Sequence, residues 1–257
     1  MAVDYERLWP HPPVELVLST NDVHVWRASL APPSSLLHHL ARTLAAEERE
    51  RAERFYFQRD RDRFVVCRGI LRSTLGGYLG VEPKAIRFRY GAYGKPFLAD
   101  AKANLCFNLS HAHGLALFAF TLDREVGVDV ESVRPLPEAR QIAEQFFSPG
   151  EIAALSQVPP GKIAEAFFNC WTRKEAFIKA KGKGLSWPLA HVEVSLAPGE
   201  PARLLGIVGE PREASRWHLQ ALTPAPGYAA AICVEGSDVR LECWEWPGIS
   251  RVLSFEL

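Results

Sequence analysis

The sequence predicts an α+β fold of two similar halves, each with a small, mostly antiparallel sheet packed on one long helix. Residues 1–122 and 123–257 each contain helical apolar patterns and short apolar runs of strand length. Near residues 64–88 and 163–194, a long helix leads through a glycine turn into a short Ile/Val strand. We interpret this as a weak internal duplication, with chance similarity as the alternative, and expect the functional site between the halves.

Composition excludes several classes of protein. The 257 residues are 47% hydrophobic, which is ample for a core, and 30 basic residues balance 30 acidic ones. No global charge therefore favours nucleic acid or a membrane. Five scattered cysteines without a CxxC pair fit a reducing cytosol. Residues 1–13 lack the apolar segment of a signal peptide, and residues 115–120 are too short to cross a bilayer, so we expect a cytoplasmic protein.

The first half is expected to begin with a strand at residues 23–26 and a helix at 33–54 that carries a leucine stripe. A second helix at 60–78 ends at Gly76-Gly77 or Gly80, because glycine is favoured just beyond a helix end. Strands follow at 86–90, 105–109 and 115–120, with a turn at 93–96.

The second half is expected to begin with an acidic strand at residues 126–130 and a helix at 137–147. Ser148-Pro149-Gly150-Glu151 has the pattern of a capping box, which predicts a further helix start. A long helix at 162–181 then ends at Gly182 and Gly184. Strands complete the half at 191–196, 203–208, 217–222, 228–234 and 239–246.

Carboxylates are concentrated in two of these elements. Asp129 and Glu131 stand at i and i+2 of a strand and so point to one side, while Glu175 and Lys179 share one helical face. Acidic groups brought together repel unless a cation lies between them, and oxygen ligands beside a lysine suit Mg²⁺ on a phosphorylated substrate. The alternative is a polar strand face and a helical ion pair of about 0.2–0.5 kcal/mol.

Other polar residues give weaker signals. Ser110 and His111 are adjacent on a strand and face opposite ways, and no nucleophile elbow surrounds the serine, which argues against a hydrolase. His111 and His113 lack a third ligand for zinc. Gly94-Lys95-Pro96 is first of all a turn. The arginines between residues 47 and 63 indicate either a solvated helix with ion pairs or a site for an anionic substrate.

Together these segments resemble the surfactin-synthetase-type 4′-phosphopantetheinyl transferases. That family has a (V/I)-G-(V/I)-D-x-E strand, present at residues 126–131, and a (W/F)-(S/C/T)-x-K-E-(A/S)-x-x-K helix, present at residues 171–179. The similarity extends through Arg54-Phe55-Tyr56, Tyr93-Gly94-Lys95-Pro96, residues 107–111 and residues 182–186, and covers most of the chain from about 47 to 196.

The resemblance implies two α+β halves with coenzyme A in the cleft between them. Asp129, Glu131 and Glu175 would hold Mg²⁺ against the coenzyme A pyrophosphate, which Lys179 would also contact. For the rest of coenzyme A, it implies phosphate contacts from Arg51 and Arg63, 3′-phosphate contacts from Ser110 and His111, and adenine contacts from Lys95 and Pro96. One departure is Glu48, which stands where a relative has a phosphate-binding lysine; we expect that contact to be lost or supplied by Arg49 or Arg51.

The implied reaction is attack of a serine hydroxyl of an apo acyl or peptidyl carrier protein on coenzyme A, which releases 3′,5′-ADP. Glu175 or a water held by the metal would accept the serine proton. The alternatives are a non-catalytic coenzyme A or nucleotide-binding module and a Mg²⁺-dependent phosphohydrolase. Because both halves belong to one chain, we expect a monomer.

Overall fold

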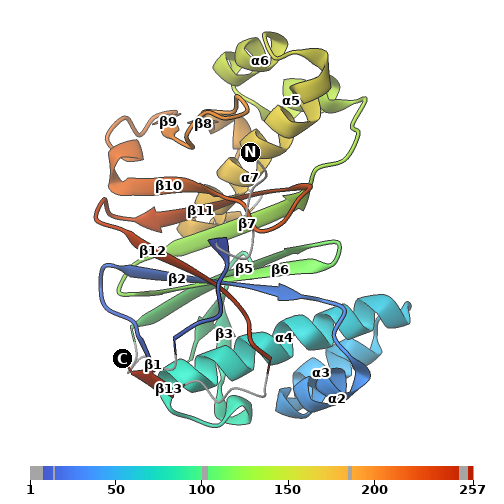
Figure 1. Ribbon diagram of the computed structural model, residues 1–257. Helices are drawn as coiled ribbons and strands as arrows, with labels where there is room; N and C mark the ends of the chain where they lie inside the picture. Colours follow the sequence, from blue (N-terminus) through green and yellow to red (C-terminus); the bar gives the residue numbers. More distant parts are fainter. Residues whose placement is uncertain (1–7, 14, 100–103, 185–186, 249–253, 257) are drawn as a thin grey trace.

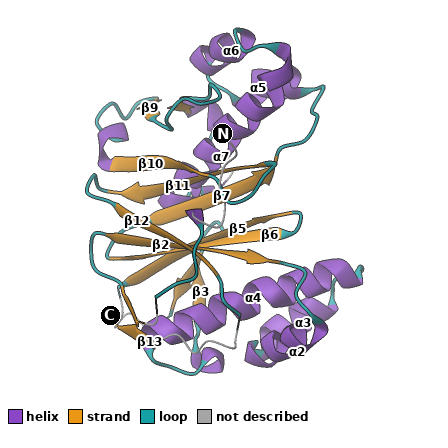
Figure 2. Ribbon diagram, viewed as in Figure 1, coloured by secondary structure: helices purple, strands orange, loops and turns teal. Residues whose placement is uncertain are grey.

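The computed structural model describes residues 8–13, 15–99, 104–184, 187–248 and 254–256. Two sheets lie face to face, with helix α4 (Gln58–Leu79) covering the outer face of one and helix α7 (Ile163–Lys181) that of the other (Figures 1 and 2). The α+β fold expected from the sequence is confirmed. None of the helices in the described ranges combines the length and hydrophobicity that a membrane crossing requires.

The sheet on α4 has four strands in the order β12-β2-β6-β5. These are β12 (Arg240–Glu245), β2 (Asp22–Ser29), β6 (Leu115–Leu122) and β5 (Leu105–Ala112). Strand β12 was expected with the second half, but it returns to pair in parallel with β2, while the other pairs are antiparallel. Each half thus contributes to this sheet, and the division at residues 122 and 123 stays a prediction.

The sheet on α7 has three antiparallel strands in the order β10-β11-β7. They are β10 (Trp217–Leu222), β11 (Tyr228–Glu235) and β7 (Val126–Ser132). Beyond α7 lie α5 (Ala139–Phe146), α6 (Pro149–Ser156) and the hairpin of β8 (Val192–Val194) and β9 (Leu204–Ile207). The predicted capping box is confirmed, since Ser148 Oγ accepts from Glu151 N at 3.2 Å and Glu151 Oε2 accepts from Ser148 N at 2.7 Å.

Smaller elements complete the fold. Strands β3 (Phe88–Tyr90) and β4 (Pro96–Leu98) form an antiparallel hairpin, and β1 (Glu15–Val17) pairs in parallel with β13 (Ser254–Glu256). Single 3-10 turns occur at Pro83–Ala85, Pro160–Lys162, Leu189–His191 and Ala214–Arg216.

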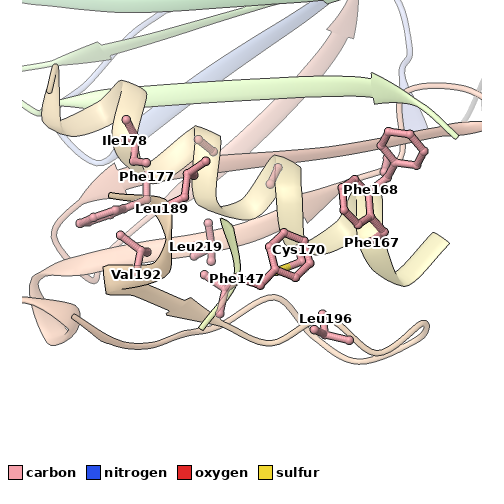
Figure 3. Close-up of a cluster of buried hydrophobic side chains, with 14 of the residues drawn as sticks. Phe147, Phe167, Phe168, Cys170, Phe177, Ile178, Leu189, Val192, Leu196 and Leu219 are labelled. Atoms are coloured by element: carbon pink, nitrogen blue, oxygen red, sulfur yellow. The ribbon is translucent and has the colours of Figure 1, made fainter. Parts of the chain in front are cut away.

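In the described ranges, three of the four buried apolar clusters hold the sheets and the two long helices together. One lies between α4 and its sheet, around Trp26, Leu71 and Phe118. A second joins the inner faces of the two sheets, where valines of β2 and β7 meet. The third packs α7 against its surroundings, with Phe167, Cys170 and Phe177 in one cluster with Phe147, Leu189, Val192 and Leu219 (Figure 3). Both long helices are thereby anchored by burial of apolar surface, and α7 becomes a fixed support for the charged residues on its other side.

The prediction of one continuous helix at residues 33–54 is wrong, because this segment forms two helices, α2 (Ser34–Thr43) and α3 (Ala46–Glu53). Leu44 and Ala45 adopt extended backbone angles between them. Glu48 Oε2 accepts from Ala45 N at 3.0 Å, and Arg49 Nη1 donates to Leu44 O at 3.0 Å. These two bonds satisfy backbone groups that a continuous helix would have paired internally. Leucine periodicity continues across the break and therefore conceals it.

A substitution at Gly127 tests how closely α7 lies on β7. A Cβ atom there would stand 2.1 Å from Ala176 O and 2.3 Å from Ala180 N, so Gly127→Ala must push the helix away from the strand. We expect a loss of about 3 kcal/mol in the free energy of unfolding, measured by chemical denaturation. The control is Gly206→Ala in β9, where no atom of the described residues lies within 4 Å of the added carbon. Equal stability of the two variants would contradict this packing.

Acid sensitivity is expected from His24. The ring is fully buried, Nδ1 lies 2.7 Å from Tyr78 Oη, and burial lowers the pKa of His24 from 6.5 to about 4. Since the unfolded chain takes up a proton near pH 6.5 and the folded one does not, stability present above that pH is lost as pH falls toward 4. As the pH falls from about 7 to about 5, His24 should lower the free energy of unfolding by about 2 kcal/mol. Denaturation curves of His24→Gln should show a weaker decline; an identical decline would exclude His24 as the cause.

Candidate functional site

The charged residues meet where the two sheets and α7 come together. Edge strands β5 and β7 lie side by side, and Asn108 Oδ1 of β5 accepts from Val128 N of β7 at 3.0 Å. Helix α7 crosses the outer face of β7 in direct contact at Gly127. Alternation along β7 sends Val126, Val128 and Val130 into the core between the sheets, so the intervening residues face α7. Asp129 and Glu131 are thus presented to the helix that carries Glu175 and Lys179.

Asp129 is at the centre of this meeting point and is only 4% exposed. Its Oδ1 accepts from Lys179 Nζ at 2.6 Å and from Ser110 Oγ at 2.8 Å. Lys179 Nζ also lies 3.0 Å from Ser110 Oγ and 3.4 Å from Val128 O. One ammonium therefore connects β5, β7 and α7. Lys179 forms a tertiary pair with Asp129 in place of the helical pair with Glu175 that was considered as the alternative.

The negative charge of Asp129 acts on both Glu175 and Glu131. Burial, followed by the charge of Asp129, raises the pKa of Glu175 to about 7, against the opposing effect of Lys179. The same two causes raise the pKa of Glu131. Buried oxygens Asp129 Oδ2 and Glu175 Oε1 have no hydrogen-bond donor among the described residues. The cluster is consequently short of positive charge and of donors.

These residues fit a hard divalent cation in their chemistry. Two buried carboxylate oxygens without a donor are the ligands that Mg²⁺ favours. Among the described residues, however, no three His, Cys, Asp or Glu side chains already form a closed group around one point. Instead, the Lys179 ammonium forms an ion pair with Oδ1 of Asp129. The donor set is therefore suitable, and the assignment of Asp129, Glu131 and Glu175 as joint ligands stays a prediction.

Two adjoining cavities extend from this cluster toward α4. One, of about 480 Å³, is lined by Glu175 and Lys179, and also by Tyr93, Gly94, Lys95, Pro96 and Leu109. The second, of about 470 Å³, shares Gly94, Pro96 and Leu109 with the first and is lined further by Arg51, Arg63, Arg68, Tyr90 and His111. We call the two cavities together the groove. Its carboxylate end and its arginine end are joined at the turn before β4.

The structure places His111, Ser110 and Lys95 at different points of the site, although the sequence analysis assigned them all to coenzyme A. His111 lies at the arginine end, where burial, Lys179 and Arg63 lower its pKa. Ser110 faces Asp129 and Lys179 instead. Lys95 lines the groove, but its Nζ already donates to Glu125 Oε2 at 2.6 Å and to Ala180 O at 2.9 Å. The 3′-phosphate and adenine contacts expected of these residues stay predictions, and residues 185 and 186 of the family-like segment lie outside the described ranges.

Sequence reasoning missed Arg68, which lines the groove beside Arg51 and Arg63. It was treated as part of a helix with an apolar stripe, in which Cys67 and Leu71 are indeed buried. The one available signal was Glu48, an acid where a relative has a phosphate-binding lysine, and Glu48 pairs with Arg68 and with Arg72. Arg49, one of the two expected replacements for a lost lysine contact, is instead used to cap α2.

Comparison with known proteins identifies the family. The 4′-phosphopantetheinyl transferase superfamily model matches residues 125–233, and a model of the N-terminal region of 4′-phosphopantetheinyl transferases matches residues 26–121. The chain is 42% identical over 243 residues to the 4′-phosphopantetheinyl transferase HetI of a Nostoc species, covering 94% of this chain and 99% of that protein. The chain belongs to the 4′-phosphopantetheinyl transferase superfamily.

One further relative and one solved structure match a smaller share of the chain. Sfp, a 4′-phosphopantetheinyl transferase of Bacillus subtilis, is 31% identical over 196 residues, which cover 76% of this chain and 84% of Sfp. Among solved structures, a holo-(acyl-carrier-protein) synthase from Bacillus anthracis in complex with CoA (3′,5′-ADP) is 19% identical with a TM-score of 0.36, over 44% of this chain and 96% of that one. The recognition made from the two signature motifs is confirmed.

In this transferase the lysine that precedes Glu175 has a structural task. Lys174 is fully buried, and its Nζ lies 2.6 Å from Glu151 Oε2 and donates to Leu189 O at 2.9 Å. Glu151 Oε1 in turn accepts from Val194 N at 2.8 Å. This buried pair ties α7 to the start of α6 and to β8, and so fixes the helix next to the residues that line the groove.

Removal of the charge of Lys174 should be costly. Lys174→Met would leave the Glu151 carboxylate buried without its cation, and we expect a loss of about 3–5 kcal/mol in the free energy of unfolding. Lys162→Met is the control, because Lys162 pairs with Glu165 at the surface and should change stability by less than about 1 kcal/mol. Equal effects in denaturant titrations would show that the buried pair does not anchor α7.

Proposed function

We propose that this protein is a Mg²⁺-dependent 4′-phosphopantetheinyl transferase that uses coenzyme A and modifies a serine of an apo acyl or peptidyl carrier protein. Membership of the superfamily supports the transfer activity. The main structural support is a groove with carboxylates and Lys179 at one end and Arg51, Arg63 and His111 at the other. A donor with a pyrophosphate and a separate phosphate would satisfy both ends.

In the proposed reaction, the serine oxygen forms a bond to the phosphorus that carries pantetheine. The bond from that phosphorus to the oxygen bridging toward adenosine breaks, and 3′,5′-ADP leaves with the electron pair. Glu175 is proposed to accept the serine proton, because its Oε1 lacks a donor among the described residues and the side chain lines the groove. Phosphoryl transfer depends mainly on positioning and charge neutralisation, which the groove residues would provide.

Asp129, Glu131 and Glu175 would hold the Mg²⁺ ion, with Lys179 beside it. When bound, the ion would neutralise charge on the pyrophosphate. Lys179 Nζ is already within hydrogen-bond distance of Asp129, and its side chain is 29% exposed in the groove. It can therefore donate to a pyrophosphate oxygen when a cation takes over the neutralisation of Asp129. Ser110, which contacts both Asp129 and Lys179, would hold these two side chains in their relative positions.

The alternatives are distinguished by their products. A non-catalytic coenzyme A or nucleotide-binding module would retain the arginine end alone, and the unpartnered carboxylate oxygens at the other end argue against it. A Mg²⁺-dependent phosphohydrolase would use the same acids with water as nucleophile. A cytoplasmic location and a monomeric state belong to the proposal; sedimentation as a stable dimer at low concentration would overturn the second.

Transfer can be tested by weighing the carrier. With coenzyme A, Mg²⁺ and a panel of apo carrier proteins, we expect the mass of one carrier to rise by one phosphopantetheine. The gain should disappear with chelator and fall at least about a hundredfold in rate in Asp129→Asn, since one charge-neutralising group is typically worth this much. Glu165→Gln, an exposed acid in the first turn of α7, is the matched control. Consumption of coenzyme A without carrier modification would favour the phosphohydrolase.

A further inference from the structure

We infer that Arg68, held between Glu48 and Tyr90, is a third guanidinium at the arginine end of the groove and sets selectivity for a donor with a 3′-phosphate. The inference rests on the proposed use of coenzyme A, and it adds a residue that neither the signature motifs nor the resemblance assigned. It rests on the position of the side chain, the way that it is held and the balance of charge around it.

The side chain of Arg68 is positioned to contact a ligand in the groove. It stands on α4, which also supplies Arg63 and Cys67 to the same cavity. Arg63 and Cys67 are one helical turn apart and share a face of α4. Arg68 is the next residue along the helix, and its side chain lines the same cavity as that of Arg63. Arg51 approaches from α3, and His111 comes from β5. Three guanidiniums thus surround one cavity, in which Asp60 is the opposing acid.

The side chain of Arg68 is held in place before any ligand binds. It is only 9% exposed, and its guanidinium carbon lies 5.0 Å from the centre of the Phe88 ring. Nη2 donates to Tyr90 Oη at 2.6 Å, and Nε lies 3.3 Å from Glu48 Oε1. No hydrogen bond from Nη1 occurs within the described part of the chain. A fixed guanidinium with donor capacity left is suited to bind phosphate, because little rotamer entropy is lost.

Glu48 is an acid close to the proposed anion site, and its partners explain why its charge is tolerated there. It is 4% exposed, and its Oε2 accepts from Arg72 Nε at 2.5 Å and from Ala45 N at 3.0 Å. Arg72 is itself buried and also donates to Pro83 O and Ile86 O. One carboxylate therefore stands against two guanidiniums, which leaves a net positive charge. Glu48 acts as a positioning residue, which directs Arg68 toward the groove while Arg72 balances its charge.

A purely structural role for the Glu48 and Arg68 pair is the competing explanation, and ligand selectivity separates the two. Calorimetry of 3′,5′-ADP and 5′-AMP compares ligands that differ only in the 3′-phosphate. In Arg68→Gln we expect affinity for 3′,5′-ADP to fall roughly ten- to a hundredfold, the range for a hydrogen bond to a charged group, with 5′-AMP changed less than about twofold. The KM for coenzyme A should rise in parallel, with the KM for dephospho-coenzyme A and kcat unchanged.

Two variants complete the design. Tyr90→Phe removes the hydroxyl that holds Nη2 on a half-exposed side chain, and it should reduce 3′,5′-ADP affinity roughly two- to fivefold with the same selectivity, even if Arg68→Gln does not fold. Arg89→Gln, an exposed arginine next to Tyr90, should leave both affinities unchanged. Equal losses for both ligands, or none, in Tyr90→Phe and in folded Arg68→Gln would overturn the inference. Failure of wild-type transfer with selective 3′,5′-ADP binding intact would refute only the proposed function.

Discussion

The close contact of α7 with β7 is the constraint on which the site depends. Gly127 lets the helix backbone touch the strand, since any side chain there would collide with Ala176 O. At this separation Lys179 Nζ reaches Asp129 Oδ1 at 2.6 Å. The glycine of the strand signature and the lysine of the helix signature are therefore two parts of one geometric requirement. This explains why the signature contains a residue without a functional group.

Charged residues lie at two places on α7, with different consequences. Where α7 meets α6 and β8, Lys174 and Glu151 neutralise each other and share their remaining bonds with backbone groups. On the groove side, Asp129, Glu131 and Glu175 outnumber Lys179, and burial together with the charge of Asp129 raises the pKa of Glu175 to about 7. The balanced pair serves stability because nothing about it is left unsatisfied. The unbalanced cluster is the part able to respond to a cation or a ligand.

The groove follows from how the two sheets meet. The valine faces of β2 and β7 pack against each other, which brings the edges of β5 and β7 together. Residues that alternate along β5 then serve opposite ends, with Ser110 toward the carboxylates and His111 toward the arginines. A single strand thus connects the two ends of the proposed coenzyme A site. The pairing of β12 with β2 adds a strand from the second half to the sheet that contains β5.

The sequence by itself determined the α+β class, most helix and strand positions, and the residues that form the carboxylate end, because periodicity and signature spacing are local properties of the chain. Only the tertiary structure decided that Lys179 pairs with Asp129, that the Lys95 amine pairs with Glu125, that residues 33–54 form two helices, and that Arg68 joins the groove. Each of these depends on a partner distant in sequence or on a side chain that satisfies the backbone. No local pattern specifies which of several charged residues a buried group will find.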